Sequence, residues 1–139
     1  MKISFDKISL KTENESDMID ITINIQRIIE DSNIKNGFIV VFVPGSTGAI
    51  TTIEYEPGLQ KDFPAMLERV SPKDILYEHE KRWNDENGHS HVRASLIGPS
   101  LVIPFRDSKL TLGIWQQVVF IELDVRPRNR EIVVQIVGE

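Results

Sequence analysis

The C-terminal third of the sequence constrains the fold most strongly, because it is rich in valine, isoleucine and leucine and is interrupted only by turn residues. Three segments there are predicted to be strands: Arg93–Phe105, Thr111–Val125 and Ile132–Val137. The alternating residues of Met1–Leu10 indicate another strand at the start of the chain. Phe38–Val43 is apolar on both faces, which predicts a strand that is buried on both sides. The chain therefore has to be built around a sheet.

Two helices are predicted between these strands. Four isoleucines from Ile21 to Ile29 recur at helical spacing and would share one helix face. Leu59–Val70 has a second amphipathic pattern, with Pro64 either in its first turn or at a kink. Strands at both ends with helices between them indicate an α+β fold with a mainly antiparallel sheet. Residues 1–139 contain no repeat or linker, so one domain is expected.

Composition and charge exclude several classes of function. The 139 residues include no cysteine, which removes thiol nucleophiles, disulfides and cysteine-type zinc sites. The net charge of −5 argues against broad binding to nucleic acid or to an anionic membrane. The longest apolar run, Phe38–Val43, is far shorter than the roughly 20 residues of a spanning helix. The N-terminus has no signal-peptide pattern, so we expect a cytoplasmic protein.

All three histidines lie between positions 79 and 91. His89 and His91 form an H-x-H pair, and on a strand two such imidazoles would point to one face and converge on a metal or an anion. A catalytic metal site usually needs a third protein ligand, for which His79, Asp85 and Glu54 are the candidates. The alternative is that these are solvated loop histidines.

The loop Pro44–Gly48 has the composition of a phosphate-binding turn. Its glycines permit close backbone approach, while the Ser46 and Thr47 hydroxyls and the backbone N–H groups up to Gly48 can hold a phosphate. The loop lacks the Gly-Lys-Ser/Thr element and following helix of a Walker loop. A purely structural turn is the alternative.

Three further features have a structural alternative beside a functional one. Glu54 could be a general base or a ligand, or it could be exposed on the same strand face as Glu56. Trp115 is interpreted as a core or subunit-interface residue, and Trp83 is the better candidate for stacking on a ligand. Arg126–Arg130 carries three arginines that could meet phosphates, although a solvated turn is favoured.

Three motifs run over essentially the whole chain: VFVPGST-A-TTIEYEPG, WND-x-NGHSH-x-RASL-GPSL-IPF, and L-LG-WQQ-x-x-x-E-D-x-RPR-R-x-VVQ-x-GE. With these motifs the sequence resembles the YjbQ family, which is also labelled secondary thiamine-phosphate synthase enzyme. The resemblance implies a compact α+β domain with a β-sandwich-like core that assembles as a homotrimer. It also implies a weak thiamine-phosphate synthase activity, which joins a hydroxymethylpyrimidine diphosphate to a thiazole phosphate.

The resemblance places the family's polar pocket at His89, with His91 nearby, and its acidic residue at Glu54. Many members carry His-Thr-Ser where this chain has Pro44-Gly45-Ser46-Thr47, so the loop histidine is absent here. His79 is the only spare imidazole that could replace it.

Two hypotheses follow from different classes of function. The first is an enzyme that binds a small phosphorylated molecule and uses a divalent metal, zinc or magnesium. Its expected residues are Glu54, His89 and Arg93 as catalytic groups, Ser46, Thr47 and Gly48 as phosphate-binding groups, and His79, His89 and His91 as metal ligands. The second is a non-catalytic trimeric protein that binds a small anion or a metal.

Overall fold

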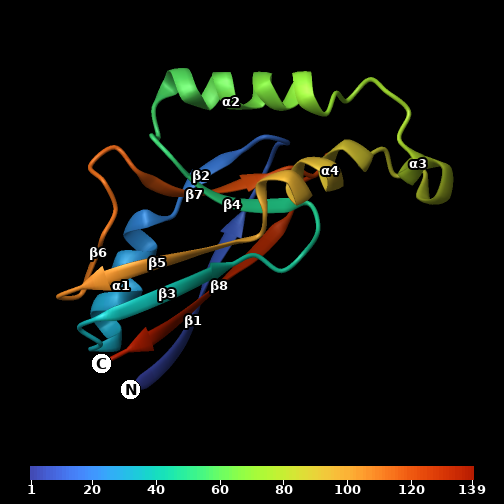
Figure 1. Cartoon of the computed structure of the whole chain (residues 1–139). Coiled ribbons are helices and arrows are strands. Elements are labelled where there is room, and N and C mark those ends of the chain that lie inside the picture. Colours follow the sequence, from blue (N-terminus) through green and yellow to red (C-terminus); the bar gives the residue numbers. More distant parts are fainter.

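The computed structural model describes residues 1–139 and contains two antiparallel sheets (Figure 1). The five-stranded sheet has, in spatial order, β1 (Lys2–Lys11), β8 (Asn129–Gly138), β3 (Gly37–Phe42), β5 (Ser100–Arg106) and β6 (Lys109–Leu110). The three-stranded sheet has, in spatial order, β2 (Met18–Asp20), β7 (Gln117–Glu122) and β4 (Gly48–Ile53). The first and last strands of the chain pair along their whole length, so the two termini lie side by side (Figure 1).

Four helices accompany the sheets. They are α1 (Thr22–Ser32), α2 (Pro57–Val70), α3 (Glu78–Trp83) and α4 (Gly88–Ile97). The α1 and α2 helices were predicted from their apolar spacing, and the α+β class with a mainly antiparallel core is confirmed. The Glu56 carboxylate caps α2 by accepting from the backbone N–H of Gly58 at 2.9 Å, and Pro57 occupies the first turn.

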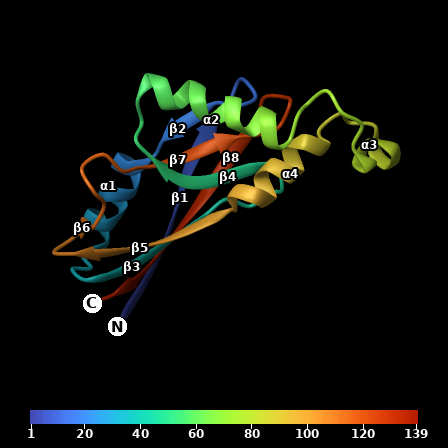
Figure 2. The ribbon, with the colours of Figure 1, turned by 45° about the horizontal axis from the view of Figure 1, so that its top comes forward.

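Side chains that alternate along β4 and β7 pack into two separate core clusters, one on each face of the three-stranded sheet. Ile50 and Phe120 belong to the large core cluster that faces the five-stranded sheet and α1. Their neighbours Ala49 and Ile121 point the other way and pack with Leu67 of α2. The three-stranded sheet therefore lies between the five-stranded sheet and a cover formed by α2 and α4 (Figures 1 and 2).

The structure corrects the strand predicted over Arg93–Phe105. Only Ser100–Arg106 is extended, and the residues before it belong to α4, which ends at Gly98 with a φ of 99°. A helix advances about 100° per residue, so positions two apart point in nearly opposite directions. His89 and His91 therefore cannot face one site as they would on a strand.

The strand predicted over Thr111–Val125 is also shorter than expected. Only Gln117–Glu122 pairs in the sheet, and the preceding segment is a loop in which Ile114 and Trp115 are 86% and 73% exposed. None of the helices is both long and apolar enough to span a membrane.

Candidate functional site

A polar cleft of about 330 Å³ lies where the β3–β4 loop, the start of α4 and the β7–β8 connection meet. Its lining residues are Gly45, Ser46, Thr47, Asp85, Asn87, His91, Arg126, Arg128 and Arg130. None of these is hydrophobic. We call this the arginine cleft.

The loop between β3 and β4 reaches the cleft through an unusual backbone conformation. Gly45 has a φ of 113°, a region that side chains other than that of glycine rarely occupy. A Cβ atom at this position would lie 3.1 Å from Nη1 of Arg130. The glycine therefore lets the guanidinium approach the loop backbone.

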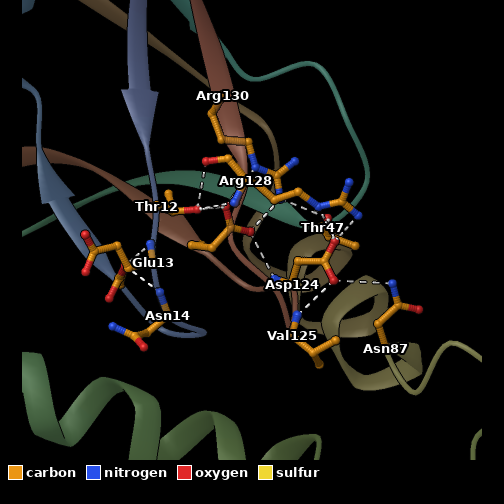
Figure 3. A network of polar contacts seen from close by, with 11 residues as sticks. Thr12, Glu13, Asn14, Thr47, Asn87, Asp124, Val125, Arg128 and Arg130 are labelled. Atoms are coloured by element: carbon orange, nitrogen blue, oxygen red, sulfur yellow. Dashed lines mark hydrogen bonds and ion pairs between the residues drawn. The ribbon is translucent and has the colours of Figure 1, made fainter.

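Two arginines of the cleft are anchored on buried carboxylates (Figure 3). Arg130 donates from Nε and Nη2 to Glu122, at 2.9 and 2.5 Å. Arg128 donates from the same two nitrogens to Asp124, with the Nε contact at 2.8 Å. Both carboxylates are fully buried at the end of β7. Each needs a cation, because an unpaired charge at such a position costs several kcal/mol.

Thr47 connects the two ion pairs. Its hydroxyl donates to Oδ2 of Asp124 at 3.1 Å and accepts from Nη2 of Arg130 at 2.9 Å (Figure 3). A hydroxyl has a single proton, so this side chain has no donor left for a ligand. Ser46, by contrast, is exposed in the same loop. The structure therefore separates the two hydroxyls that the sequence placed together as phosphate ligands.

The loop that follows β1 also belongs to this network, through Thr12. The Thr12 hydroxyl lies 2.9 Å from Oε2 of Glu122 and accepts the backbone N–H of Arg128 at 3.0 Å. This side chain is also buried. The position of the arginines is thus fixed by β1, β7 and β8 together.

The charge state of Asp124 follows from these contacts. Burial raises the pKa of its carboxyl, but hydrogen bonds from Arg128, from the backbone N–H of Val125 and from the Thr47 hydroxyl outweigh burial. The pKa of Asp124 is therefore held below its ordinary value. An ionised Asp124 keeps Arg128 in place at neutral pH.

Two of the three histidines meet at the cleft. The ring of His91 lies 4.5 Å from the ring of His79, measured between centroids. Nε2 of His79 lies 3.2 Å from Oδ1 of Asp85. A carboxylate and two imidazoles are thus present beside the arginines as groups that can accept or donate protons.

Asn87 lies between these residues and the buried Asp124. With its amide nitrogen toward Asp124, as drawn in Figure 3, the contact is 3.5 Å, which is too long for a good hydrogen bond. With the amide turned over, the nitrogen donates to Oδ1 of Asp85 at 2.8 Å. The second orientation satisfies the group better, so Asn87 holds Asp85 beside His79.

His89 is on the other side of α4. Its Nε2 contacts a carboxylate oxygen of Glu15, whose second oxygen pairs with Lys73 at 2.6 Å. This side chain is 3% exposed and lines a separate cavity of about 480 Å³. The predicted convergence of His89 and His91 is therefore wrong, because the segment that carries them is helical.

The expected metal ligands do not form a site in this arrangement. His79 and His91 lie together, but His89 is turned away from them. No group of three or more histidine or acidic side chains is arranged to hold a metal ion. The chemistry proposed below is assigned to the arginines and their neighbours.

Arg93 and Glu54 lie outside the arginine cleft. The guanidinium of Arg93 is buried and donates to the carbonyl of Ser71 at 3.0 and 2.8 Å and to Glu68 at 2.7 Å. The backbone N–H of Lys73, then Arg93, lowers the pKa of Glu68. Arg93 thus ties the end of α2 to α4.

Glu54 is exposed just beyond the end of β4, whereas the cleft lies before its start at Gly48. At about 3.3 Å per strand residue, the two places are roughly 20 Å apart. The structure therefore does not bring Glu54 together with the phosphate loop.

The similarity to known proteins extends over nearly the whole chain. A family model described as "UPF0047 protein YjbQ-like" matches residues 6–139. The chain belongs to the YjbQ-like UPF0047 family. This YjbQ-like chain is 39% identical over 139 residues to a UPF0047 protein of Methanothermobacter thermautotrophicus, covering 100% of the chain and 95% of that relative. It is 30% identical over 133 residues to the UPF0047 protein YugU of Bacillus subtilis, covering 94% of the chain and 97% of YugU.

Solved structures of other proteins share the fold of this YjbQ-like chain. A YbjQ-like protein of unknown function from Sulfolobus solfataricus has a TM-score of 0.94 at 36% identity, over 99% of each chain. A hypothetical protein from Aeropyrum pernix has a TM-score of 0.90 at 30% identity, over 98% of this chain and 99% of that one.

The structure of this YjbQ-like protein corrects the interpretation of Arg126–Arg130 as a solvated turn. Arg130 is only 8% exposed and Arg128 is half-buried, whereas Arg126 is exposed. The signal that could have found them is the pair Glu122 and Asp124 within an apolar segment. Two carboxylates at buried positions demand cations, and the nearest arginines follow directly.

Proposed function

We propose that this protein binds a small phosphorylated molecule, with the phosphate in the arginine cleft. The observation that carries the proposal is a cleft lined by three arginines and no hydrophobic residue in a chain of net charge −5. Inside a cleft the local field outweighs the net charge of the protein. A small anion is therefore favoured there, while a polyanion such as nucleic acid is not.

The anchored arginines keep donors free for such a ligand. Arg128 and Arg130 each use Nε and Nη2 on their carboxylates, which leaves Nη1 of each guanidinium without a partner from the chain. Nη1 of Arg130 faces the loop at Gly45. Guanidinium groups held in this way bind phosphate with little loss of side-chain freedom. Arg126 is exposed and has no carboxylate partner, so it supplies a positive charge that the two neutralised ion pairs do not.

A thiamine-phosphate synthase activity is the second candidate, and the histidines beside the cleft favour it. In that reaction the thiazole nitrogen forms a bond to the methylene carbon of the pyrimidine, and diphosphate departs with the electron pair of the broken C–O bond. The arginines would neutralise the charge on the departing diphosphate. His91 and Asp85 lie close enough in the cleft to exchange protons with bound groups. A binding protein without catalysis needs only the arginines.

Calorimetric titration of the purified full-length protein with diphosphate tests the proposal. Arg126→Gln should weaken diphosphate binding at least about tenfold, because a hydrogen bond to a charged group contributes about 1.5–3 kcal/mol. Arg106→Gln is the matched control, since Arg106 is also exposed but ends β5, outside the cleft. The proposal fails if diphosphate does not bind saturably, or if the two variants behave alike.

The same preparation separates catalysis from binding. With both substrates present, formation of thiamine phosphate that is lost in His91→Ala supports the enzyme. Diphosphate binding without any product formation supports the non-catalytic alternative.

We also propose a homotrimer, as the resemblance implies. The outer face of the five-stranded sheet supports self-association, because it exposes large apolar side chains on neighbouring strands. These are Ile3 (71%), Phe5 (58%), Phe38 (41%), Phe42 (40%) and Val102 (64%). Val40 pairs with Val102, and Phe38 pairs with Val137 and Pro104, so the patch is continuous. Faces of this kind usually mark an interface between proteins.

A further inference from the structure

A second, smaller hollow adjoins the arginine cleft. It measures about 140 Å³ and is lined by Gly45, Ser46, Gly48, His91, Ala94, Ser95 and Pro99. Three of these residues, Gly45, Ser46 and His91, also line the arginine cleft. They therefore form the boundary between the two spaces, and we call the smaller one the side hollow.

The boundary is open on the loop side because position 45 carries no side chain. The backbone there has a φ of 113°, so glycine is the residue that fits it without strain. A ligand whose phosphate lies on the arginines can extend past this point. Its substituent would then enter the side hollow, which is bordered by the second half of α4 and by Pro99.

The lining of the side hollow indicates the kind of substituent. Ser46 and Ser95 offer hydroxyls that no other group of the chain uses, and His91 offers an imidazole. Ala94 is the one hydrophobic side chain in the lining. Hydroxyls and an imidazole both donate and accept hydrogen bonds, so they match a substituent with hydroxyl groups of its own.

The volume sets the size of that substituent. In another protein, a cavity of about 150 Å³ accommodates a molecule as large as benzene. The side hollow is slightly smaller, at about 140 Å³. A group of a few carbon and oxygen atoms therefore fits within the side hollow.

We propose that the ligand of the arginine cleft is a phosphate ester of a small hydroxylated organic group. The phosphate lies on the arginines and the organic group lies in the side hollow. This inference rests on the proposed function, because it presupposes that the cleft holds the phosphate. It adds the chemical class of the ester.

The test compares three probes by calorimetry on the full-length protein: inorganic phosphate, glycerol 1-phosphate and phenyl phosphate. Glycerol 1-phosphate is expected to bind at least about tenfold more tightly than inorganic phosphate, because its hydroxyls meet the two serines. Phenyl phosphate, which is similar in size but apolar, is expected to gain less than about threefold, since the lining is polar.

Ser95→Phe isolates the side hollow. Ser95 is exposed, so the variant is expected to keep the fold, and Ser95 lines the hollow, so the larger side chain is expected to fill it. Binding of glycerol 1-phosphate should fall to the level of inorganic phosphate, while inorganic phosphate binding stays within about twofold. Leu96→Phe is the control, because Leu96 is 60% exposed and lines neither cavity. It should change neither affinity.

Several results would overturn the inference. Equal binding of inorganic phosphate and glycerol 1-phosphate by the unmodified protein would show that no ester group is recognised, although the cleft would still bind phosphate. Equal binding of phenyl phosphate and glycerol 1-phosphate would refute the hydroxylated group. A loss of inorganic phosphate binding in Ser95→Phe would show that the two spaces are not separate subsites. Absence of binding by all three probes would refute the proposed function as well.

Discussion

Thr47 shows how single residues hold the arginine cleft together. Its hydroxyl joins Asp124 and Arg130, two groups that belong to different ion pairs. Removing the hydroxyl leaves a buried carboxylate one donor short and a buried guanidinium one acceptor short.

Thr47→Val should therefore lower the free energy of unfolding by about 1–3 kcal/mol, because the buried groups lose a partner without a change in side-chain volume. Thr47→Ser keeps the hydroxyl and should lose less than about 1 kcal/mol. Urea unfolding followed by circular dichroism measures both variants. Equal stability of the valine variant and the unmodified protein would contradict the network.

The lowered pKa of Asp124 predicts a dependence of stability on pH. A carboxyl whose pKa is lower in the folded protein than in the unfolded chain stabilises the fold fully above its ordinary pKa of 3.8. That contribution is lost as the pH falls below this value and through the lower pKa of the folded state.

Asp124→Asn removes the titrating group, so the variant should be less stable than the unmodified protein at pH 7. The difference should shrink as the pH falls from 4 to 2, which thermal unfolding across this range can measure. A difference that stays constant over the range would show that Asp124 does not supply it.

The sequence can indicate that Glu122 and Asp124 need cations, but it does not show which residues complete this network, because those partners are set by topology. Glu122 lies at the end of β7 in one sheet and Arg130 lies on β8 in the other. Thr12, which contacts Glu122 and the backbone of Arg128, is 110 positions from Glu122. Only the packing of the two sheets brings them together.

Among the elements, α4 decides which predicted site residues meet. It turns His91 toward the arginine cleft and His89 toward Glu15 on its other side. The two histidines therefore have different roles although they are two residues apart.

The two alanine variants should separate these roles. His91→Ala is expected to weaken diphosphate binding about tenfold with little change in stability, since His91 is only half-buried in the cleft wall. His89→Ala should lower the free energy of unfolding by about 1–3 kcal/mol, because it breaks a buried contact with Glu15. Its diphosphate affinity should stay within about twofold. The opposite pattern would restore His89 as the site residue.

The helices with a clear apolar period, α1 and α2, could be predicted, but α4 could not. Val92 and Leu96 are exposed, so its apolar residues do not mark the buried face. That face consists of small and polar residues, including Ser90 and Ala94, which carry no periodic signal. The apolar run of β5 begins shortly after Gly98. The sequence therefore predicts one strand where the structure has the end of α4 followed by β5.

For the whole molecule, the two faces of the five-stranded sheet explain why we expect the protein to associate with copies of itself. One face of the five-stranded sheet covers the core, while the other exposes the continuous apolar patch described above. The sequence indicated a sheet but not which face is left uncovered, because both faces of β3 and β5 are apolar.

Val102→Lys places a charge in the middle of this patch and should convert the proposed trimer to a monomer, since a charge at the core of an interface is costly to bury. Val70→Lys is the control, because Val70 is similarly exposed, at 58%, but lies at the end of α2. Sedimentation equilibrium at micromolar concentration gives the masses. A monomeric mass for the unmodified protein would contradict the trimer.

The central claim is that the anchored arginines bind the phosphate of a small molecule. A crystal structure of the protein with diphosphate bound tests it most directly. We expect the phosphate oxygens within hydrogen-bonding distance of Nη1 of Arg128 and Arg130, beside Ser46. Diphosphate bound elsewhere, such as in the cavity lined by His89, would contradict the account.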